Sequence, residues 1–452
     1  MKKIKQPYFL IIGLGASGVS MAKFLRSKGE AVVATDIDES RANIAKELNT
    51  LGIETEIGFH NQETFNRAHV MIPSPGIPLT NKFIKTAQGL GVGITGELDI
   101  FTQYNDRPII AITGTNGKTT TTTLIGEMLR QSDMTPFVGG NIGTPLVDFL
   151  MSKKTADVIV AEISSFQLDI SKRFKPDVGV LLNISGDHLD RYERYTAYED
   201  SKWSIFKNQM SSDKAILNLS VKGLNKAYGK LKSKIFLFSS DKDTLTNCSA
   251  KIGSKQIEFI MEGLHHRIKT DHLKELVGTH NRENVAAAAL ACLALGVDIN
   301  GILKGLETFK NLPHRIEFIK TIKGVSFYND SKATNTDAVI RAIECFQKNI
   351  VLILGGREKG TDFSLLTTAV RQSVKAIIAI GESKKHIKDT FKNICTVKKA
   401  QTMKEAVKKA FDMAFKNDIV LLSPACASFD MYDNYGHRGT DFATHVTALG
   451  KK

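Results

Sequence analysis

Short, continuously apolar segments alternate with longer amphipathic segments along most of the chain. The first apolar segment, Tyr8 to Ile12, precedes a helix-like segment from Ser17 to Ser27 and a second apolar segment from Ala31 to Thr35. Strands that are apolar on both faces are typical of parallel sheets covered by helices. The pattern therefore predicts an α/β fold built on parallel sheets.

The alternating strand-like and helix-like segments form three blocks along the chain, which predicts three domains. Asn105 to Pro108 and Asn311 to Pro313 are rich in residues that interrupt helices and strands, and we place the boundaries there. We expect a Rossmann-like N-terminal domain over 1–106, a central domain with a mostly parallel sheet over 107–311, and a Rossmann-like C-terminal domain over 312–452. The strands expected in the two later domains are 109–113, 158–163, 178–184, 215–219, 325–328, 350–354, 376–380 and 419–422, with helices over 121–130, 284–295 and 403–415.

Composition narrows the class of protein. The 452 residues are 42% apolar and 24% charged, as in soluble globular proteins, and no apolar stretch approaches the roughly 20 residues that span a membrane. The five cysteines form no CxxC pair, which argues against disulfides or zinc and favours the cytoplasm. The net charge of +14 is spread along the chain without a nucleic-acid signature, so we expect small acidic substrates rather than nucleic acid or membrane partners.

A Gly-rich turn after the apolar segment Ile109 to Thr113 carries the strongest chemical signal. It is followed by a Lys, two Thr and a helix-like segment, which is the layout of a phosphate-binding loop, although Ile112 stands where the first Gly is usual. Backbone N–H groups and a helix N-terminus bind phosphate, the Lys reaches the outer phosphates, and a hydroxyl holds Mg²⁺. The central domain is therefore predicted to be an ATPase domain of the phosphate-loop type, with ATP bound by Gly114, Thr115, Asn116, Gly117, Lys118, Thr119 and Thr120.

A second Gly-rich turn, Gly13 to Gly18, follows the first predicted strand, and Asp36 ends the next one. This spacing is typical of a dinucleotide site and leaves a nicotinamide-dependent dehydrogenase open. A dehydrogenase does not need the second, Lys-containing loop. Both loops make sense if the first holds a nucleotide-linked substrate and the second holds ATP.

Polar residues also follow several other predicted strands. Glu162 ends the strand over 158–163, where a carboxylate can hold Mg²⁺, and His188 lies in the cluster Asp187 to Tyr192. In the third block, three polar loops follow strands and suggest a site for an anion such as a carboxylate: 330–335, 355–360 and 423–430. Cys426 is interpreted as a small buried residue, and spacing alone leaves Lys202 a solvated side chain.

Together these segments resemble the Mur ligase family, ATP-dependent amide-forming enzymes of peptidoglycan precursor synthesis. The loop Gly114 to Thr119 is shared across that family and with folylpolyglutamate synthases. The finer motifs resemble the branch that joins D-glutamate to UDP-N-acetylmuramoyl-L-alanine, and they lie in the expected order along nearly the whole chain: 13–18, 74–78, 139–143, 164–168, 187–192 and 423–430.

The resemblance implies roles for residues that spacing alone does not resolve. It implies two Mg²⁺ ions held by Thr119, Glu162, His188 and Lys202, the last as a carbamate, with Lys118, His188 and Lys202 as the catalytic residues. It extends the ATP site to Asn281, Asn284, Arg315 and Asp330. It assigns the UDP-linked substrate to Gly15, Ala16, Ser17, Asp36, Ser74, Gly76, Asn141 and His188, and D-glutamate to Lys332, Thr334, Lys359, Ser428 and Phe429. It also implies a monomer.

Two positions depart from the family pattern. Ile37-Asp38 replaces the Thr-Arg often found after Asp36, near the uridine diphosphate, and Asp38 would repel a diphosphate there. Tyr435 stands where a Phe is familiar. The alternatives are a ligase for another amino acid, a folylpolyglutamate synthase, the dehydrogenase, and a nucleotide switch, for which no NKxD motif is apparent.

Overall fold

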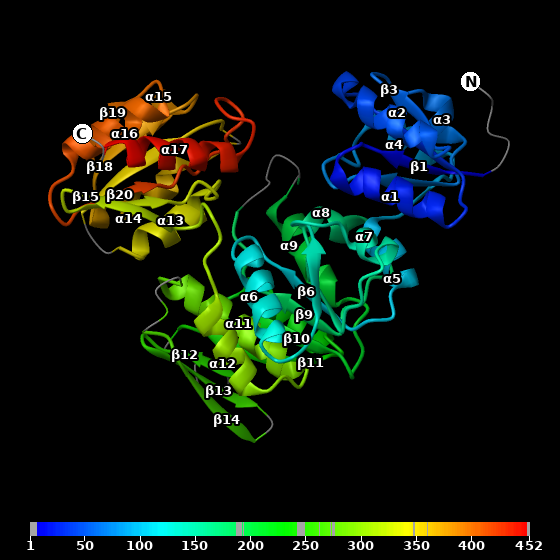
Figure 1. Ribbon diagram of the computed structural model, residues 1–452, viewed down its shortest axis with the longest axis horizontal. Coiled ribbons are helices and arrows are strands. Elements are labelled where there is room, and N and C mark those ends of the chain that lie inside the picture. Colours follow the sequence, from blue (N-terminus) through cyan, green and yellow to red (C-terminus); the bar gives the residue numbers. More distant parts are fainter. Residues whose placement is uncertain are drawn as a thin grey trace.

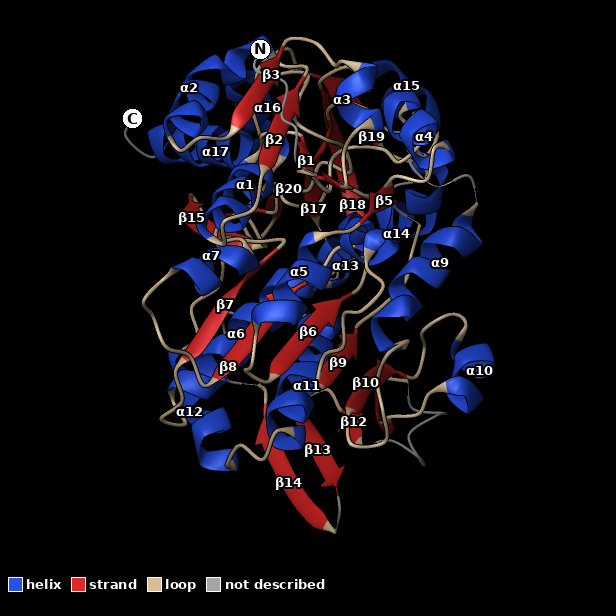
Figure 2. Cartoon of the chain, turned by 90° about the vertical axis from the view of Figure 1, so that its right-hand side faces the viewer, coloured by secondary structure: helices blue, strands red, loops and turns tan. Residues whose placement is uncertain are grey.

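Three sheets, each covered by helices, form three domains (Figure 1). The computed structural model describes residues 7–449 except 187–191, 193, 242–248, 262, 272, 274–275, 347–348 and 359. In Figure 1 the N-terminal and C-terminal domains lie above the central domain, on its right and left sides, and Figure 2 shows the same arrangement from the side. The predicted α/β fold with three domains is confirmed.

The N-terminal domain is a five-stranded parallel sheet in the order β3-β2-β1-β4-β5. This is the order of a Rossmann-type sheet, in which ligands bind beyond the carboxyl ends of the strands. The Gly-rich turn lies between β1 and α1, at that edge. The elements are β1 (Phe9–Ile12), α1 (Ala16–Ser27), β2 (Val32–Asp36), α2 (Ala42–Thr50), β3 (Glu54–Ile57), α3 (Gln62–Asn66), β4 (Val70–Pro73), α4 (Lys82–Gly89), β5 (Gly93–Ile94) and α5 (Glu97–Tyr104).

The central domain has a nine-stranded sheet in the order β14-β13-β12-β11-β10-β9-β6-β8-β7. Its strands are parallel from β7 to β12, and β13 and β14 add an antiparallel end. The sequence analysis did not predict β7 or this antiparallel end. The elements are β6 (Ile109–Thr113), α6 (Lys118–Arg130), β7 (Pro136–Gly140), α7 (Leu146–Met151), β8 (Val158–Glu162), α8 (Ser165–Ile170), β9 (Val178–Leu181), α9 (Tyr195–Trp203), β10 (Lys214–Asn218), α10 (Leu224–Ala227), β11 (Lys234–Ser239), β12 (Ala250–Ile252), β13 (Gln256–Met261), β14 (Leu264–Lys269), α11 (Thr279–Ala294) and α12 (Ile299–Thr308).

The C-terminal domain has a six-stranded sheet in the order β15-β16-β20-β17-β18-β19, parallel except for the edge strand β15. The loops after β16, β17 and β20 therefore leave the same edge of the sheet, as the sequence predicted. The elements are β15 (Glu317–Ile322), β16 (Val325–Asn329), α13 (Thr336–Glu344), β17 (Ile350–Gly355), α14 (Thr367–Ser373), β18 (Val374–Ile380), α15 (Lys384–Phe391), β19 (Thr396–Lys399), α16 (Met403–Met413), β20 (Ile419–Leu422) and α17 (Tyr435–Leu449).

Helix α5 joins the first two domains. Its Leu98 and Phe101 are fully buried in the central hydrophobic core, together with Ile109 of β6. The Glu97 carboxylate accepts hydrogen bonds from the backbone N–H groups of Leu146 (2.7 Å) and Val147 (3.4 Å), at the start of α7. The helix thus packs on the central domain although it precedes the linker.

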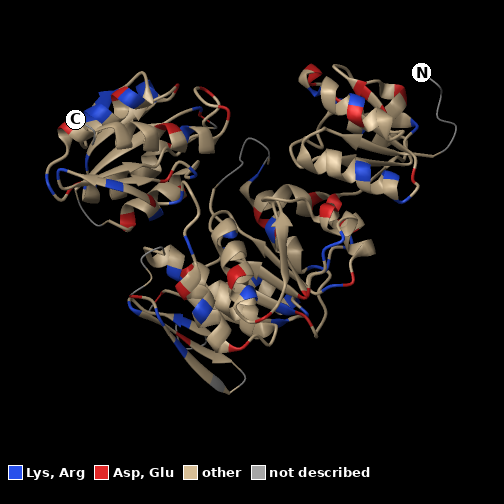
Figure 3. Ribbon diagram, in the orientation of Figure 1, with Lys and Arg blue, Asp and Glu red and all other residues tan. Residues whose placement is uncertain are grey.

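Lys and Arg residues are spread over all three domains (Figure 3). In the part of the chain that the structure describes, no helix is both long enough and apolar enough to cross a bilayer. The four described cysteines, Cys292, Cys345, Cys395 and Cys426, are all free thiols.

Candidate active site

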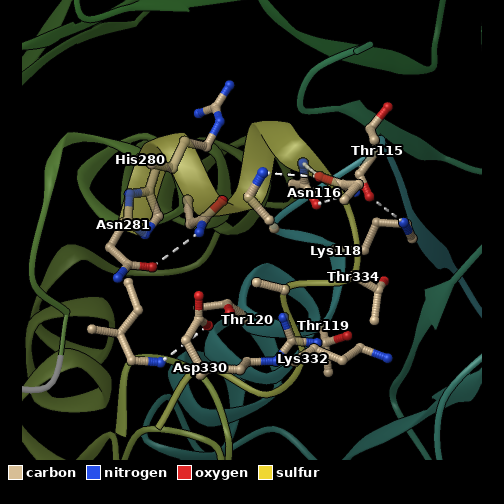
Figure 4. A pocket seen from close by; sticks show the side chains of 18 of the residues that line it. Thr115, Asn116, Lys118, Thr119, Thr120, His280, Asn281, Asp330, Lys332 and Thr334 are labelled. Atoms are coloured by element: carbon tan, nitrogen blue, oxygen red, sulfur yellow. Dashed lines mark hydrogen bonds between the residues drawn. The ribbon is translucent and has the colours of Figure 1, made fainter. Parts of the chain in front are cut away.

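A cavity of about 270 Å³ lies where the central domain faces the C-terminal domain. Its walls come from the loop after β6, the ends of β7 and β8, the start of α11, and the loops around β16 (Figure 4). Most of the predicted ATP-site residues line it: Thr115, Asn116, Gly117, Lys118, Thr119, Thr120, Asn281, Asn284, Arg315 and Asp330. Gly114 lies next to them on the loop.

The phosphate loop takes its shape from two asparagines and a glycine. Asn183 accepts a hydrogen bond from the N–H of Asn116 through Oδ1 (2.9 Å) and donates to the carbonyl of Asn116 through Nδ2 (3.0 Å). Gly117 has φ = +85°, and a Cβ there would lie 2.3 Å from Oδ1 of Asn284. Helix α6 begins directly afterwards at Lys118, so its first N–H groups face the cavity as an anion-binding helix N-terminus does.

Two lysines reach the same loop carbonyl. The Nζ atoms of Lys118 and Lys202 each donate to the carbonyl oxygen of Gly114 at 2.8 Å, and Lys118 also donates to Thr115 at 2.8 Å. Lys202, on α9, is only 2% exposed, and its Nζ lies 4.6 Å from the ring centroid of Tyr198. The structure therefore buries Lys202 against the phosphate loop, although it does not line the cavity, whereas its sequence context alone had suggested a solvated side chain.

Glu162 ends β8 as a buried carboxylate at the cavity wall. Its Oε1 accepts a hydrogen bond from Nδ2 of Asn141 at 2.7 Å, whereas Oε2 has no hydrogen-bond partner among the residues the structure describes. A buried carboxylate oxygen without a donor is costly unless a cation binds it. Mg²⁺ typically uses one or two protein oxygens together with substrate phosphates, so Glu162 and the Thr119 hydroxyl fit such a site. No group of three or more His, Cys, Asp and Glu residues suits a metal ion in the described residues.

The opposite wall combines a buried cation with a buried acid. Burial raises the pKa of Asp330 to about 7, against the hydrogen bond from the Ser423 hydroxyl (2.9 Å) and the nearby charge of Arg315. Burial lowers the pKa of Arg315, while the negative charges of Glu162 and Asp330 oppose this shift. The Arg315 guanidinium therefore lies near two acidic side chains, Glu162 at the end of β8 and Asp330 after β16.

His280 also lines the cavity. Burial and the positive charge of Arg341 lower its pKa to about 4, so the imidazole is neutral at physiological pH. Beside it, Asn281 accepts a hydrogen bond from Nδ2 of Asn284 at 3.2 Å. His280, Asn281 and Asn284 are therefore uncharged hydrogen-bonding groups in the cavity wall, close to the charged Arg341.

Three protein-family models match the chain in the order of its domains. They are described as the Mur ligase MurD-like N-terminal domain (residues 8–96), the Mur ligase middle domain (112–292) and the Mur ligase glutamate ligase domain (314–426). Curated relatives extend over nearly the full length. One, the UDP-N-acetylmuramoylalanine--D-glutamate ligase of Desulfosudis oleivorans, is 40% identical over 97% of this chain and 96% of its own. This chain belongs to the Mur ligase family.

Other relatives of this Mur ligase agree with that assignment. The ligase of the same name from Geotalea daltonii is 40% identical over 99% of this chain and 98% of its own. Two solved structures from Thermotoga maritima share the fold: UDP-N-acetylmuramate-alanine ligase MurC (TM-score 0.61, 18% identity, 98% and 100% of the two chains) and MurF ligase in complex with ADP (TM-score 0.61, 16% identity, 99% and 100%).

In this Mur ligase the first Gly-rich turn is packed tightly against its neighbours. The Ser74 hydroxyl donates to the carbonyl of Gly13 at 2.8 Å, and Asp36 accepts from the N–H of Leu14 at 2.6 Å. A Cβ on Gly18 would lie 1.9 Å from the Gly13 carbonyl oxygen, which explains the third glycine. Ser17 and Ser74 line a small cavity near this turn. Gly15, Ala16 and Gly76 lie on the same turns, whereas Asn141 lines the ATP-side cavity instead.

The predicted amino-acid pocket divides into two groups. Lys332 and Thr334 line the main cavity, and Nζ of Lys332 lies 4.0 Å from the ring centroid of Tyr435. Ser428 is buried and Phe429 is 58% exposed, and neither lines that cavity. His188 and Lys359 lie outside the described residues.

Several site residues were not predicted. In the C-terminal domain, Asp337 and Asn335 are hydrogen-bonded to Asn116 of the phosphate loop. Arg341 of the same domain lines the cavity, as does His280 of α11. Asn335 lies in the polar loop 330–335, and His280 directly precedes the predicted Asn281, whereas no local signal marked Asp337 or Arg341. Cys426 is buried as predicted, and burial raises its pKa to about 12.

Proposed function

We propose that this Mur ligase joins D-glutamate to UDP-N-acetylmuramoyl-L-alanine with ATP, through an acyl phosphate, in peptidoglycan precursor synthesis. The observation that carries the proposal is the cavity in which the phosphate loop of the central domain faces Lys332 and Thr334 of the C-terminal domain. Relatives of about 40% identity that span the whole chain carry the name of this activity. The glutamate ligase domain model matches the part of the chain that bears these two residues.

We propose one substrate for each domain. Residues 1–106 bind the UDP end of the precursor, 107–311 bind ATP and Mg²⁺, and 312–452 bind D-glutamate. We propose that the protein acts as a monomer, as the resemblance to the family implies. ATP is plentiful in the cytoplasm, and we place the reaction there.

The chain's own groups fit the chemistry of ATP activation. The α6 N-terminus and Lys118 bind the phosphates, and Lys118 exchanges its loop carbonyls for phosphate oxygens when ATP is present. Thr119 and Glu162 would hold Mg²⁺, and we propose that His188 and Lys202, the latter as a carbamate, would hold a second ion. Mg²⁺ supplies neutralisation of the charge that moves between the phosphate oxygens. A carbamate converts the buried Lys202 ammonium into an anion.

The reaction then proceeds in two steps. A carboxylate oxygen of the UDP-linked substrate attacks the γ-phosphorus, the bond to the β-phosphate oxygen breaks, and ADP leaves. The amine of D-glutamate attacks the acyl carbon, loses a proton, and expels inorganic phosphate as the amide forms. Lys332 and Thr334, on the same cavity as the phosphate loop, orient the carboxylates of the incoming amino acid. Water must be excluded because it would hydrolyse the acyl phosphate.

Phosphate release tests this proposal. ATP, Mg²⁺ and UDP-N-acetylmuramoyl-L-alanine are supplied with D-glutamate, L-glutamate, L-lysine, meso-diaminopimelate or no amino acid. We expect release with D-glutamate alone. Release with another amine would keep the ligase chemistry but refute the substrate, and no release with any of them would refute the reaction.

A further inference from the structure

The phosphate loop is hydrogen-bonded to the C-terminal domain through the side chain of Asn116. Nδ2 of Asn116 donates to Oδ2 of Asp337 at 2.7 Å, across 221 positions of sequence. Asn335, the N-cap of α13, adds a bond from its Nδ2 to Oδ1 of Asn116 at 3.3 Å. The main chain of Asn116 is held by Asn183 of the central domain, so this residue is bound from both domains.

Asp337 is itself held in place. Arg341, one turn further along α13, donates through Nε to Oδ2 of Asp337 at 3.0 Å and through Nη1 to Oε2 of Glu283 at 3.4 Å. Glu283 belongs to α11 of the central domain, and its Oε1 accepts from the Ser240 hydroxyl at 2.6 Å. The Arg341 and Asp337 side chains are each 26% exposed and that of Glu283 is 16% exposed, so solvent screens these charges only in part.

Asp337 lies close in sequence to the proposed D-glutamate pocket. Thr334 of the proposed D-glutamate pocket stands just before the N-cap of α13, and Asp337 lies in the first turn of that helix. The amino-acid pocket and Asp337 therefore move as one unit. A hydrogen bond weakens steeply beyond its normal length, so the Asn116 contact forms only when the C-terminal domain lies against the central domain.

We propose that Asp337 is a positioning residue that, through the Asn116 side chain, holds the phosphate loop in its ATP-binding conformation when the amino-acid pocket is in place. Arg341 and Glu283 orient its carboxylate. The inference rests on the proposed function in that the loop takes ATP and the C-terminal domain takes the amine. Two separate consequences follow, one for the loop without any substrate and one for turnover.

The test compares Asp337→Ala and Asp337→Asn with Asp389→Asn, which makes the same change to an exposed carboxylate on α15. Hydrogen–deuterium exchange of loop residues 114–120 is measured in the full-length protein without nucleotide. Kinetic constants are then measured for ATP and for D-glutamate separately. Melting temperatures report whether each variant is folded.

We expect faster loop exchange in Asp337→Ala and a KM for ATP raised about tenfold, the effect of one hydrogen bond to a charged group. Asp337→Asn should be intermediate because its amide oxygen still accepts from Asn116 but has lost its charge toward Arg341. The KM for D-glutamate should change less than that for ATP, and Asp389→Asn should match the wild type.

Unchanged loop exchange and unchanged KM for ATP in a folded Asp337→Ala variant would overturn the proposal. A purely structural role would lower the melting temperature without separating the two KM values. If Asp337→Ala does not fold, Arg341→Ala carries the test, because it leaves Asp337 in place without support. If no amine supports turnover by the wild type, the proposed function fails, while the exchange measurement still decides the role of Asp337.

Discussion

Glu97 makes the stability of the junction between the first two domains depend on pH. It is 7% exposed, and burial raises its pKa from 4.5 to about 7 despite hydrogen bonds from Val147, Leu146 and Gln167. The folded protein therefore binds this proton more tightly than the unfolded chain does. The resulting stabilisation is complete below about pH 4.5 and is lost as pH rises through about 7.

The size of this effect follows from the shift. A difference between 4.5 and about 7 corresponds to roughly 3 kcal/mol of unfolding free energy. Glu97→Gln removes the titration, while its amide oxygen can still accept from the N–H of Leu146. The variant should therefore gain stability relative to the wild type, by up to roughly 3 kcal/mol, between about pH 4.5 and 8.

Urea unfolding at several pH values measures this difference. The single tryptophan, Trp203 at the end of α9, gives a fluorescence signal from the central domain on which Glu97 packs. Glu307→Gln, an exposed change on α12, is the matched control and should follow the wild type at every pH. Parallel curves for the wild type and Glu97→Gln across this range would refute the reasoning, because the carboxylate would then titrate alike in both states.

Three further variants test the site itself. Lys118→Ala should lower turnover by at least about a thousandfold because a phosphate-binding cation is lost, and near-normal phosphate release would contradict the loop assignment. Lys202→Ala should be similarly impaired, with partial recovery on adding short carboxylates; full wild-type activity in bicarbonate-free buffer would count against the carbamate. Glu162→Gln should raise the Mg²⁺ concentration needed for half-maximal turnover at least about tenfold, and a Mg²⁺ titration that matches the wild type would remove Glu162 from the metal site.

The strands that the sequence predicted have local signals, whereas others, including β3, β4, β11, β15 and β19, were not predicted. The apolar segments at β1, β8, β17 and β20 read as buried parallel strands, and all four are present. Strand β7, Pro136–Gly140, was missed because Pro and Gly are poor strand formers, and its pairing with β8 supplies what its own sequence lacks.

The antiparallel end of the central sheet was missed for a different reason. Strand β13, Gln256–Met261, alternates between half-buried and buried residues because only one of its faces packs on the core. It therefore lacks the continuously apolar segment that is typical of strands buried on both faces. Alternation of polar and apolar residues from Gln256 to Phe259 would have been the signal for this strand.

The site residues likewise fall into those that local sequence predicts and those that come together only on folding. The phosphate loop was predictable because glycine, lysine and threonine must occur at fixed spacing to bind phosphate. Lys202 contacts Gly114, 88 positions away, and Asp337 contacts Asn116, 221 positions away. No local sequence pattern predicts such contacts, because they depend on packing between distant elements. The resemblance to a family had indicated Lys202 but not Asp337.

The path of a single oxygen tests the central claim most directly. UDP-N-acetylmuramoyl-L-alanine labelled with ¹⁸O in its carboxylate is incubated with ATP, Mg²⁺ and D-glutamate, and the phosphate and the UDP-linked product are analysed by mass spectrometry. The account predicts one labelled oxygen in the released phosphate and a product heavier by one glutamate residue. Unlabelled phosphate, or a product without glutamate, would contradict it.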